Sequence, residues 1–183
     1  MRLTILGLLA VAAWLSLQCQ SASGETSNRA SSCPADLETL TSLMLKDLPS
    51  YANRVIQRVR GPKILPTYVI IAGRAEFQPL SLGPGKYNPV PSLAKPEAPQ
   101  QVFFTTLERQ YLNNRAIETQ NYHWLFLTQT DGGWRMAMLF SRLGSPVKDD
   151  PPSPPLETSE GIIGQAVSLW LRDCRAGAIK NHP

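Results

Sequence analysis

Two runs of aromatic and aliphatic residues, separated by a short turn, dominate the hydrophobic pattern between residues 122 and 143. The turn reads Asp-Gly-Gly at 131–133, and glycine reaches the positive φ values that a tight hairpin needs. With a three-residue loop, Thr130 faces Trp134 and both faces of the predicted β-hairpin are apolar. One face then carries Trp124, Phe126, Met136, Met138 and Phe140, and the other carries Leu125, Leu127, Ala137 and Leu139. A two-residue loop redistributes these residues without creating a polar face, so either register predicts a central position in a sheet.

Three further segments complete the strand pattern. Residues 68–77 begin with β-branched residues and then alternate, residues 101–112 form the next strand, and residues 115–130 lead into the hairpin. Prolines interrupt residues 79–100 and 145–159, which predicts two proline-rich loops without a regular ladder. The pattern therefore predicts a four-stranded antiparallel sheet.

Helical periodicity appears at both ends of the domain. Leu37, Leu40, Met44 and Leu48 recur at spacings of three and four, which predicts an amphipathic helix that begins at Pro34 and ends before Pro49. The period resumes over residues 51–59, as a second helix or as the continuation of one kinked helix. A last helix is predicted over residues 160–176, with Ser159 as N-cap and Gly177 as C-terminal stop. The expected fold class is α+β, with N-terminal helices and a C-terminal helix packed on the sheet.

The first residues have the pattern of an export signal. Arg2 is followed by an uncharged apolar run over residues 3–17 and then by small polar residues, with a predicted cut after Ser23. In the alternative, Cys19 is lipidated as in a lipoprotein signal, although that pattern prefers a small residue where Gln18 stands. The remaining chain divides into a flexible leader at 24–32, a single domain at 33–177 and a tail at 178–183.

Composition and cysteine usage agree with an exported protein. The net charge is only +4 and is spread along 183 residues, whereas a nucleic-acid binder concentrates its basic residues. With Cys19 set aside, Cys33 and Cys174 are left, and in an oxidising compartment this pair predicts a disulfide. Two separate buried thiols are the alternative.

His123 is the one histidine within the predicted domain. As a catalytic base it has an accessible pKa, and Glu108 on the neighbouring strand and the adjacent Tyr122 are candidate partners in a pocket. A half-buried histidine with one backbone partner is the interpretation we favour. No HxH, HExxH or CxxC spacing is present, so neither a metal nor a cofactor is expected.

Positive charge gathers near the end of the N-terminal helical region. The residues are Arg54, Arg58, Arg60 and Lys63. Cations at the end of a helix complement its dipole, and they are also the candidate contact with an anionic membrane surface or an acidic protein. Arg109, Arg115, Arg135 and Arg142 on the strands are expected to be solvated or paired.

A helix followed by an antiparallel sheet with a late Asp-Gly-Gly-Trp-Arg hairpin, at residues 131–135, resembles the cystatin-like and NTF2-like curved-sheet domains. The resemblance covers residues 33–143. It implies a small ligand held in the sheet concavity, with His123 as the counterpart of acid-base residues in enzymatic members. The terminal helix at 160–176 departs from the pattern.

The sequence thus predicts an exported, disulfide-closed, non-catalytic binding or accessory module at the bacterial cell envelope or outside the cell, with a protein or membrane-surface partner and without nucleic acid. A small-ligand or enzymatic pocket near His123 and a structural lipoprotein tethered through Cys19 are the alternatives.

Overall fold

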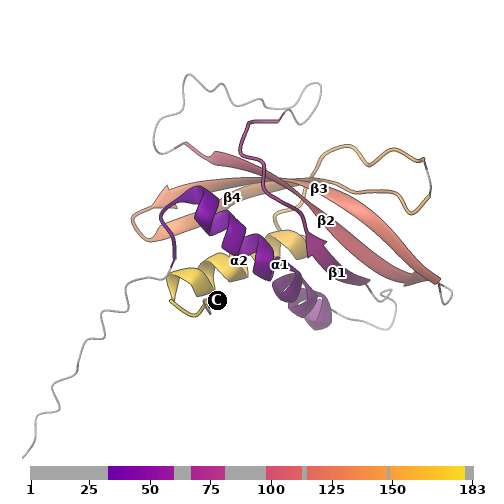
Figure 1. The fold of residues 1–183 in the computed structure, drawn as a ribbon, viewed down its shortest axis with the longest axis horizontal. Helices are drawn as coiled ribbons and strands as arrows, with labels where there is room; N and C mark the ends of the chain where they lie inside the picture. The colour runs from indigo at the N-terminus through magenta and orange to yellow at the C-terminus, as the bar shows by residue number, and fades with distance from the viewer. Residues whose placement is uncertain (1–32, 60–66, 81–97, 113–114, 148, 180–183) are drawn as a thin grey trace, which may run out of the picture.

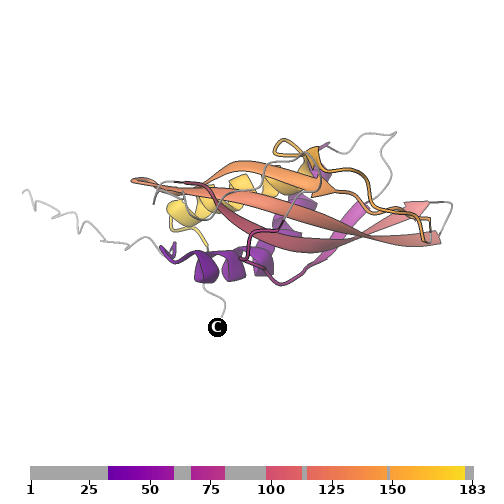
Figure 2. The same cartoon turned by 90° about the horizontal axis from the view of Figure 1, so that it is seen from above.

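A computed structural model describes residues 33–59, 67–80, 98–112, 115–147 and 149–179, and these form an α+β fold. The elements are, in chain order, α1 (Leu37–Val59), β1 (Thr67–Ala72), β2 (Gln100–Leu112), β3 (Arg115–Thr130), β4 (Gly133–Arg142), β5 (Leu156–Glu157) and α2 (Ile162–Arg175). The five strands make one open antiparallel sheet in the order β1-β2-β3-β4-β5. Both helices lie against the same face of the sheet, as Figures 1 and 2 show.

The N-terminal helical region is one helix rather than two. It begins at Leu37, later than expected from Pro34, because the Asp36 carboxylate accepts hydrogen bonds from the backbone N–H and the hydroxyl of Thr39. Pro49 lies inside α1 and does not end it. The buried stripe continues on both sides of the proline, from Leu40 to Ile56, and this burial offsets the hydrogen bond that a proline removes.

The β3–β4 hairpin has a two-residue loop, so Thr130 pairs with Gly133 and not with Trp134. Gly133 has a φ of +90°, which explains the glycine at this position. A bulge beyond Leu127 then restores the expected pairing farther from the turn, where Trp124 faces Phe140.

The bulge changes where two side chains of β4 lie. Met136 pairs with Leu127 and packs on the main core, although it was expected on the face of Trp124. Ala137, expected on the face of Leu125 and covered there, is exposed. The main apolar core lies between the sheet and the helices, and a smaller cluster around Trp124 and Phe126 lies on the opposite face.

The sheet has one strand more than the sequence predicted. β5 occupies part of the segment 145–159, which was expected to be a linker, and pairs with Phe140 and Ser141 of β4. At the other edge, β1 ends at Ala72, yet the chain continues along β2 through a bridge between Glu76 and Phe103. Both differences arise at the edges, where one-sided pairing leaves only a weak pattern in the sequence.

The predicted disulfide is present and connects the two helical ends. Cys33, just before α1, is bonded to Cys174 in the last turn of α2, with their Cα atoms 5.0 Å apart. Gly177 follows α2 with a φ of +66°, as expected for a C-terminal stop. Ser159 does not cap α2, whose N-cap is Gly161, because its hydroxyl accepts a hydrogen bond from the Leu139 N–H instead.

Candidate functional site

His123 lies on the helix-facing side of β3, in a chain of hydrogen-bonded side chains. Its Nε2 is 2.9 Å from the Thr106 hydroxyl of β2, and its Nδ1 is 2.8 Å from the Ser141 hydroxyl of β4. Ser141 is in turn 2.6 Å from the Thr158 hydroxyl, which donates to the carbonyl oxygen of Leu139. Alternation along three adjacent strands brings these residues together, since each occupies an inward position of its strand.

This chain is sealed from solvent around the imidazole. His123 is 1% exposed, Thr106 1% and Ser141 2%. The ring also lies 5.0 Å from the ring of Phe104, centroid to centroid. Burial lowers the pKa of His123 from 6.5 to about 3, so the imidazole is neutral at physiological pH. Both nitrogens of this neutral imidazole therefore lie within hydrogen-bond distance of neighbouring hydroxyls.

The other two residues of the predicted pocket do not contact the imidazole. Glu108 lies on the same face of the sheet and reaches His123 only through Thr106, whose hydroxyl is 3.4 Å from the carboxylate. Burial raises the pKa of Glu108 above its usual value, against hydrogen bonds from Asn121 and Thr106 that lower it. Tyr122 precedes His123 on the strand, and its side chain packs with the Trp124 cluster on the opposite face.

The buried imidazole makes the stability of the fold depend on pH. The pKa of His123 is lower in the folded chain than in the unfolded chain, so its contribution is complete above pH 6.5 and is lost as the pH falls toward 3. We expect the free energy of unfolding to fall by about 2 kcal/mol between pH 6.5 and pH 5 from this group alone. Urea unfolding at several pH values measures this dependence.

The variant His123→Asn is the control for this prediction. It should lose the part of the dependence between pH 6.5 and pH 5 that comes from the imidazole. The other described carboxyl groups with a lowered pKa, Asp36 and Glu157, start from ordinary values of 3.8 and 4.5 and are lowered further, so they do not titrate in that interval. Glu108, whose pKa is raised, acts with the opposite sign and is unchanged in the variant. An equal pH dependence in both proteins would contradict the assignment to His123.

The predicted cationic surface has a different character, because it is open. Arg54 and Arg58 are both exposed and one turn apart on α1. The Arg54 guanidinium lies 4.0 Å from the centre of the Tyr51 ring, a cation–π contact that orients it. Arg60 and Lys63, the other two residues of this prediction, lie outside the described residues.

Arg58 also lines a groove of about 360 Å³ between α1 and the beginning of α2. The α1 side contributes Val55, Arg58 and Val59, and the other side contributes Ser159, Glu160, Gln165, Ser168 and Leu169. No spacing in the sequence points to the residues of the α2 side, since only the packing of the two helices places them opposite Arg58.

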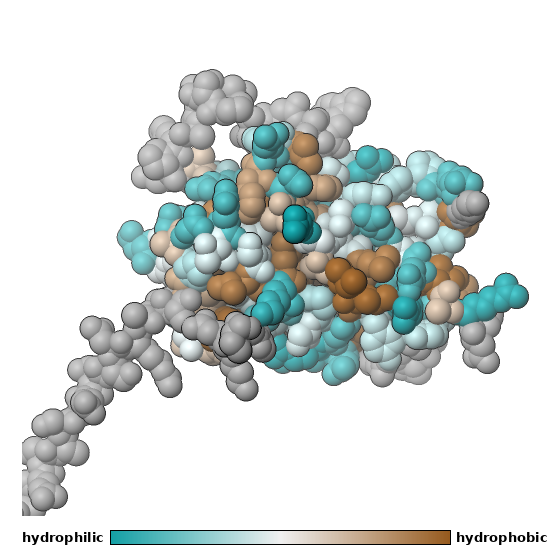
Figure 3. Space-filling model, viewed as in Figure 1, coloured by the Kyte–Doolittle hydropathy of each residue, from teal (hydrophilic) through white to brown (hydrophobic). Residues whose placement is uncertain are grey.

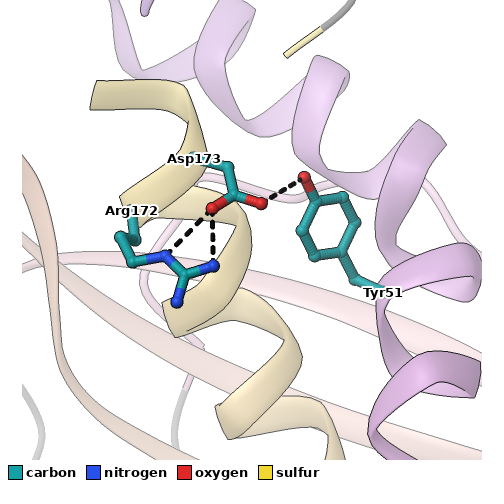
Figure 4. Close-up of polar contacts among 3 residues, drawn as sticks. All are labelled: Tyr51, Arg172 and Asp173. Carbon is teal, nitrogen blue, oxygen red and sulfur yellow. Dashed lines mark hydrogen bonds and ion pairs between the residues drawn. The ribbon is translucent and has the colours of Figure 1, made fainter. Parts of the chain in front are cut away.

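A polar cluster, which Figure 4 shows, connects the helices beside this surface. The Tyr51 hydroxyl donates to the Asp173 carboxylate at 3.0 Å, and the Arg172 guanidinium binds the other carboxylate oxygen at 2.8 and 2.9 Å. Tyr51 therefore has two contacts, with Asp173 through its hydroxyl and with Arg54 through its ring. The spacing of Tyr51 and Arg54 by three residues was a signal available in the sequence, whereas the contact with Asp173, 122 residues later, was not.

Two further findings concern the described residues alone. No group of three or more His, Cys, Asp or Glu side chains among them is arranged to hold a metal ion. None of their helices is long and apolar enough to span a membrane. Cys19 and the apolar run at 3–17 lie outside the part of the chain that the structure describes, so export and lipidation stay predictions.

Comparison with known proteins yields no relative: no family model, no curated protein and no solved structure matches the chain.

Proposed function

We propose that this protein is an exported, non-catalytic binding module that contacts an anionic membrane surface through Arg54 and Arg58. The observation that carries the proposal is the position of these two cations, which are exposed and one turn apart on α1. Arg58 lines the groove, and the guanidinium of Arg54 is held against the ring of Tyr51. Anionic lipid headgroups attract such side chains by about 1 kcal/mol for each Lys or Arg near the surface.

The disulfide and the predicted signal support the location in this proposal. A disulfide such as Cys33–Cys174 persists in oxidising compartments, and an apolar run like that at residues 3–17 is typical of export. The proposed location is therefore the bacterial cell envelope or the extracellular space, either free or anchored through Cys19.

The geometry around His123 favours binding over catalysis. A general base must be within hydrogen-bond reach of a substrate proton, and the imidazole here is enclosed with both nitrogens in contact with hydroxyls. The alternative of an enzymatic or small-ligand pocket beside His123 would require a route to the ring. His123 lines neither the groove beside Arg58 nor the groove between α1 and residues 72–77.

Vesicle sedimentation tests the proposed surface. The oxidised protein is expressed from the full sequence and processed by the cell. It should sediment with phosphatidylcholine vesicles that contain one third phosphatidylglycerol, and not with pure phosphatidylcholine vesicles. Arg54→Ala/Arg58→Ala should lower the partition coefficient roughly tenfold or more, since two cationic contacts are lost. High salt should weaken binding of the unmodified protein as well, because screening shortens the reach of the charges.

Arg109→Ala/Arg115→Ala is the matched control. It removes the same charge from two strand arginines, of which Arg109 is bonded to Glu118 at 2.6 Å, and it should bind as the unmodified protein does. If both double variants lose binding equally, net charge and not this surface is responsible. If the unmodified protein does not bind anionic vesicles, the membrane-surface proposal is wrong.

A further inference from the structure

One edge of the sheet is covered by a side chain at one residue, and farther along no described residue covers it. In β1, the Asn53 side chain of α1 accepts a hydrogen bond from the Val69 N–H and donates to the Val69 carbonyl, both at 2.9 Å. This amide takes the place of a neighbouring strand at that residue. Exposed strand edges pair readily with other chains, and such a cover prevents it.

Beyond β1 the edge continues, and no side chain among the described residues covers it as Asn53 covers Val69. Gly73 donates to the Thr105 carbonyl, and Glu76 exchanges two hydrogen bonds with Phe103 at 2.7 and 2.8 Å. In an antiparallel ladder, the backbone groups of successive residues point alternately toward and away from the neighbouring strand. The N–H and C=O groups of Ala75 and Phe77 therefore point outward, and no hydrogen bond joins them to another described residue.

A groove accompanies this open part of the edge. It has a volume of about 390 Å³ and lies between one turn of α1, with Ser42, Leu45 and Lys46, and residues 72–77 on the sheet side. Figure 1 shows the chain after β1 passing beside α1, and Figure 3 shows hydrophobic surface bordered by strongly hydrophilic side chains in this region. Lys46 lies seven residues before Asn53, about 10 Å along the helix axis, so the two sites on the edge are distinct.

The rim of this groove carries positive charge. Lys46 and Arg74 line it and are both exposed, and none of its described lining residues is acidic. Neither cation forms an ion pair with another described residue. Leu45, Ala75 and Phe77 supply apolar surface between the two charges. The combination of outward backbone groups, apolar floor and cationic rim is the pattern for adding an extended peptide strand with acidic side chains.

We propose that an extended acidic peptide segment of another protein binds at residues 75–77 as an added strand, with its carboxylates against Lys46 and Arg74. This site is separate from the Arg54 and Arg58 surface and does not depend on the membrane proposal. Main-chain hydrogen bonds to Ala75 and Phe77 supply affinity, and the two cations select acidic over basic sequences.

Fluorescence anisotropy tests the proposed strand addition. A labelled peptide of alternating valine and glutamate is titrated with the oxidised full-length protein, and binding is expected. A peptide of alternating valine and lysine should bind at least tenfold more weakly. Lys46→Glu/Arg74→Glu should weaken binding of the glutamate peptide by a factor of ten or more. Ala75→Pro should do the same, because proline removes the outward N–H and leaves the bonds of Glu76 to Phe103 in place.

Two control variants and a modified peptide separate the explanations. Arg109→Glu/Arg115→Glu makes the same charge change elsewhere, and Arg54→Ala/Arg58→Ala removes the other surface; both should bind the glutamate peptide normally. The glutamate peptide N-methylated at alternate residues should bind weakly, since it lacks the donors of one strand edge. Circular dichroism of each variant confirms that the fold is retained.

Four results would overturn the proposal. The first is absence of binding to the glutamate peptide. The second is binding that survives both Ala75→Pro and N-methylation, which would indicate an anion site without strand addition. The third is binding that appears only after residues 81–97 are replaced by a glycine-serine linker, since a segment of the same chain would then occupy the edge. The fourth is self-association abolished by Lys46→Glu/Arg74→Glu, which would make a second copy the occupant.

Discussion

Replacing Trp170 by alanine is expected to destabilise the fold by about 3 to 5 kcal/mol. Trp170 is the largest of the fully buried side chains that the structure describes, so its removal leaves a cavity between α2 and the other elements. Its indole N–H also donates to the Asp47 carboxylate of α1 at 2.9 Å, and that contact is lost as well. Because domains of this size are stable by only about 5 to 15 kcal/mol, the variant should approach global unfolding. Urea unfolding at pH 7 measures the change.

Trp170→Phe separates the two contributions. It keeps most of the apolar volume and loses the hydrogen bond to Asp47, which as a bond to a charged group contributes about 1.5 to 3 kcal/mol. The phenylalanine variant should therefore lie between the unmodified protein and Trp170→Ala. A loss below about 1 kcal/mol in Trp170→Ala would contradict the position of this residue in the core.

Removal of the Cys33–Cys174 disulfide is expected to cost about 2 to 5 kcal/mol. The bond joins residues 141 positions apart, and in the chain-entropy model so long a loop contributes about 5 kcal/mol, with less observed when the unfolded state keeps structure. It also holds the chain before α1 against the last turn of α2, so its loss frees both helical ends. Urea unfolding of Cys33→Ser/Cys174→Ser against the oxidised protein measures the cost.

Reductant provides the control for the disulfide. Dithiothreitol should lower the stability of the unmodified protein to that of the double serine variant and should leave the variant unchanged. An unfolding midpoint of the unmodified protein that does not respond to reductant, under conditions that reduce the bond, would show that the bond contributes little to stability.

Local patterns predicted the interior elements better than the edges. The hairpin of β3 and β4 was identified from its apolar runs and its glycines, and Gly177 from its place after the last helical period, because these signals lie within a few residues of one another. β5 has only two residues among prolines and carries no such pattern. Its pairing with Phe140 and Ser141 exists because the chain returns beside β4, which only the assembled sheet determines.

The same distinction applies to the candidate sites. Arg54 and Arg58 were found from their spacing. The α2 side of the groove beside Arg58 depends instead on how two helices pack together that are separated in sequence by all the strands of the sheet. His123 was recognised as the one histidine of the domain, with a half-buried position expected. That its two nitrogens meet Thr106 and Ser141 follows from strand register across β2, β3 and β4, which no local pattern encodes.

The sequence by itself determined the α+β class, the long antiparallel strands, the helical stripes and the pairing of Cys33 with Cys174. Strands and helices follow from the periodicity of neighbouring residues, and one pair of cysteines is left once Cys19 is set aside. Tertiary structure decided that α1 runs through Pro49, that a bulge turns Met136 toward the core, and that Asn53 covers Val69 while no described residue pairs with the outward side of residues 75–77. In each of these cases the conformation depends on contacts between elements far apart in the chain, and the burial and hydrogen bonds gained there outweigh the local preference.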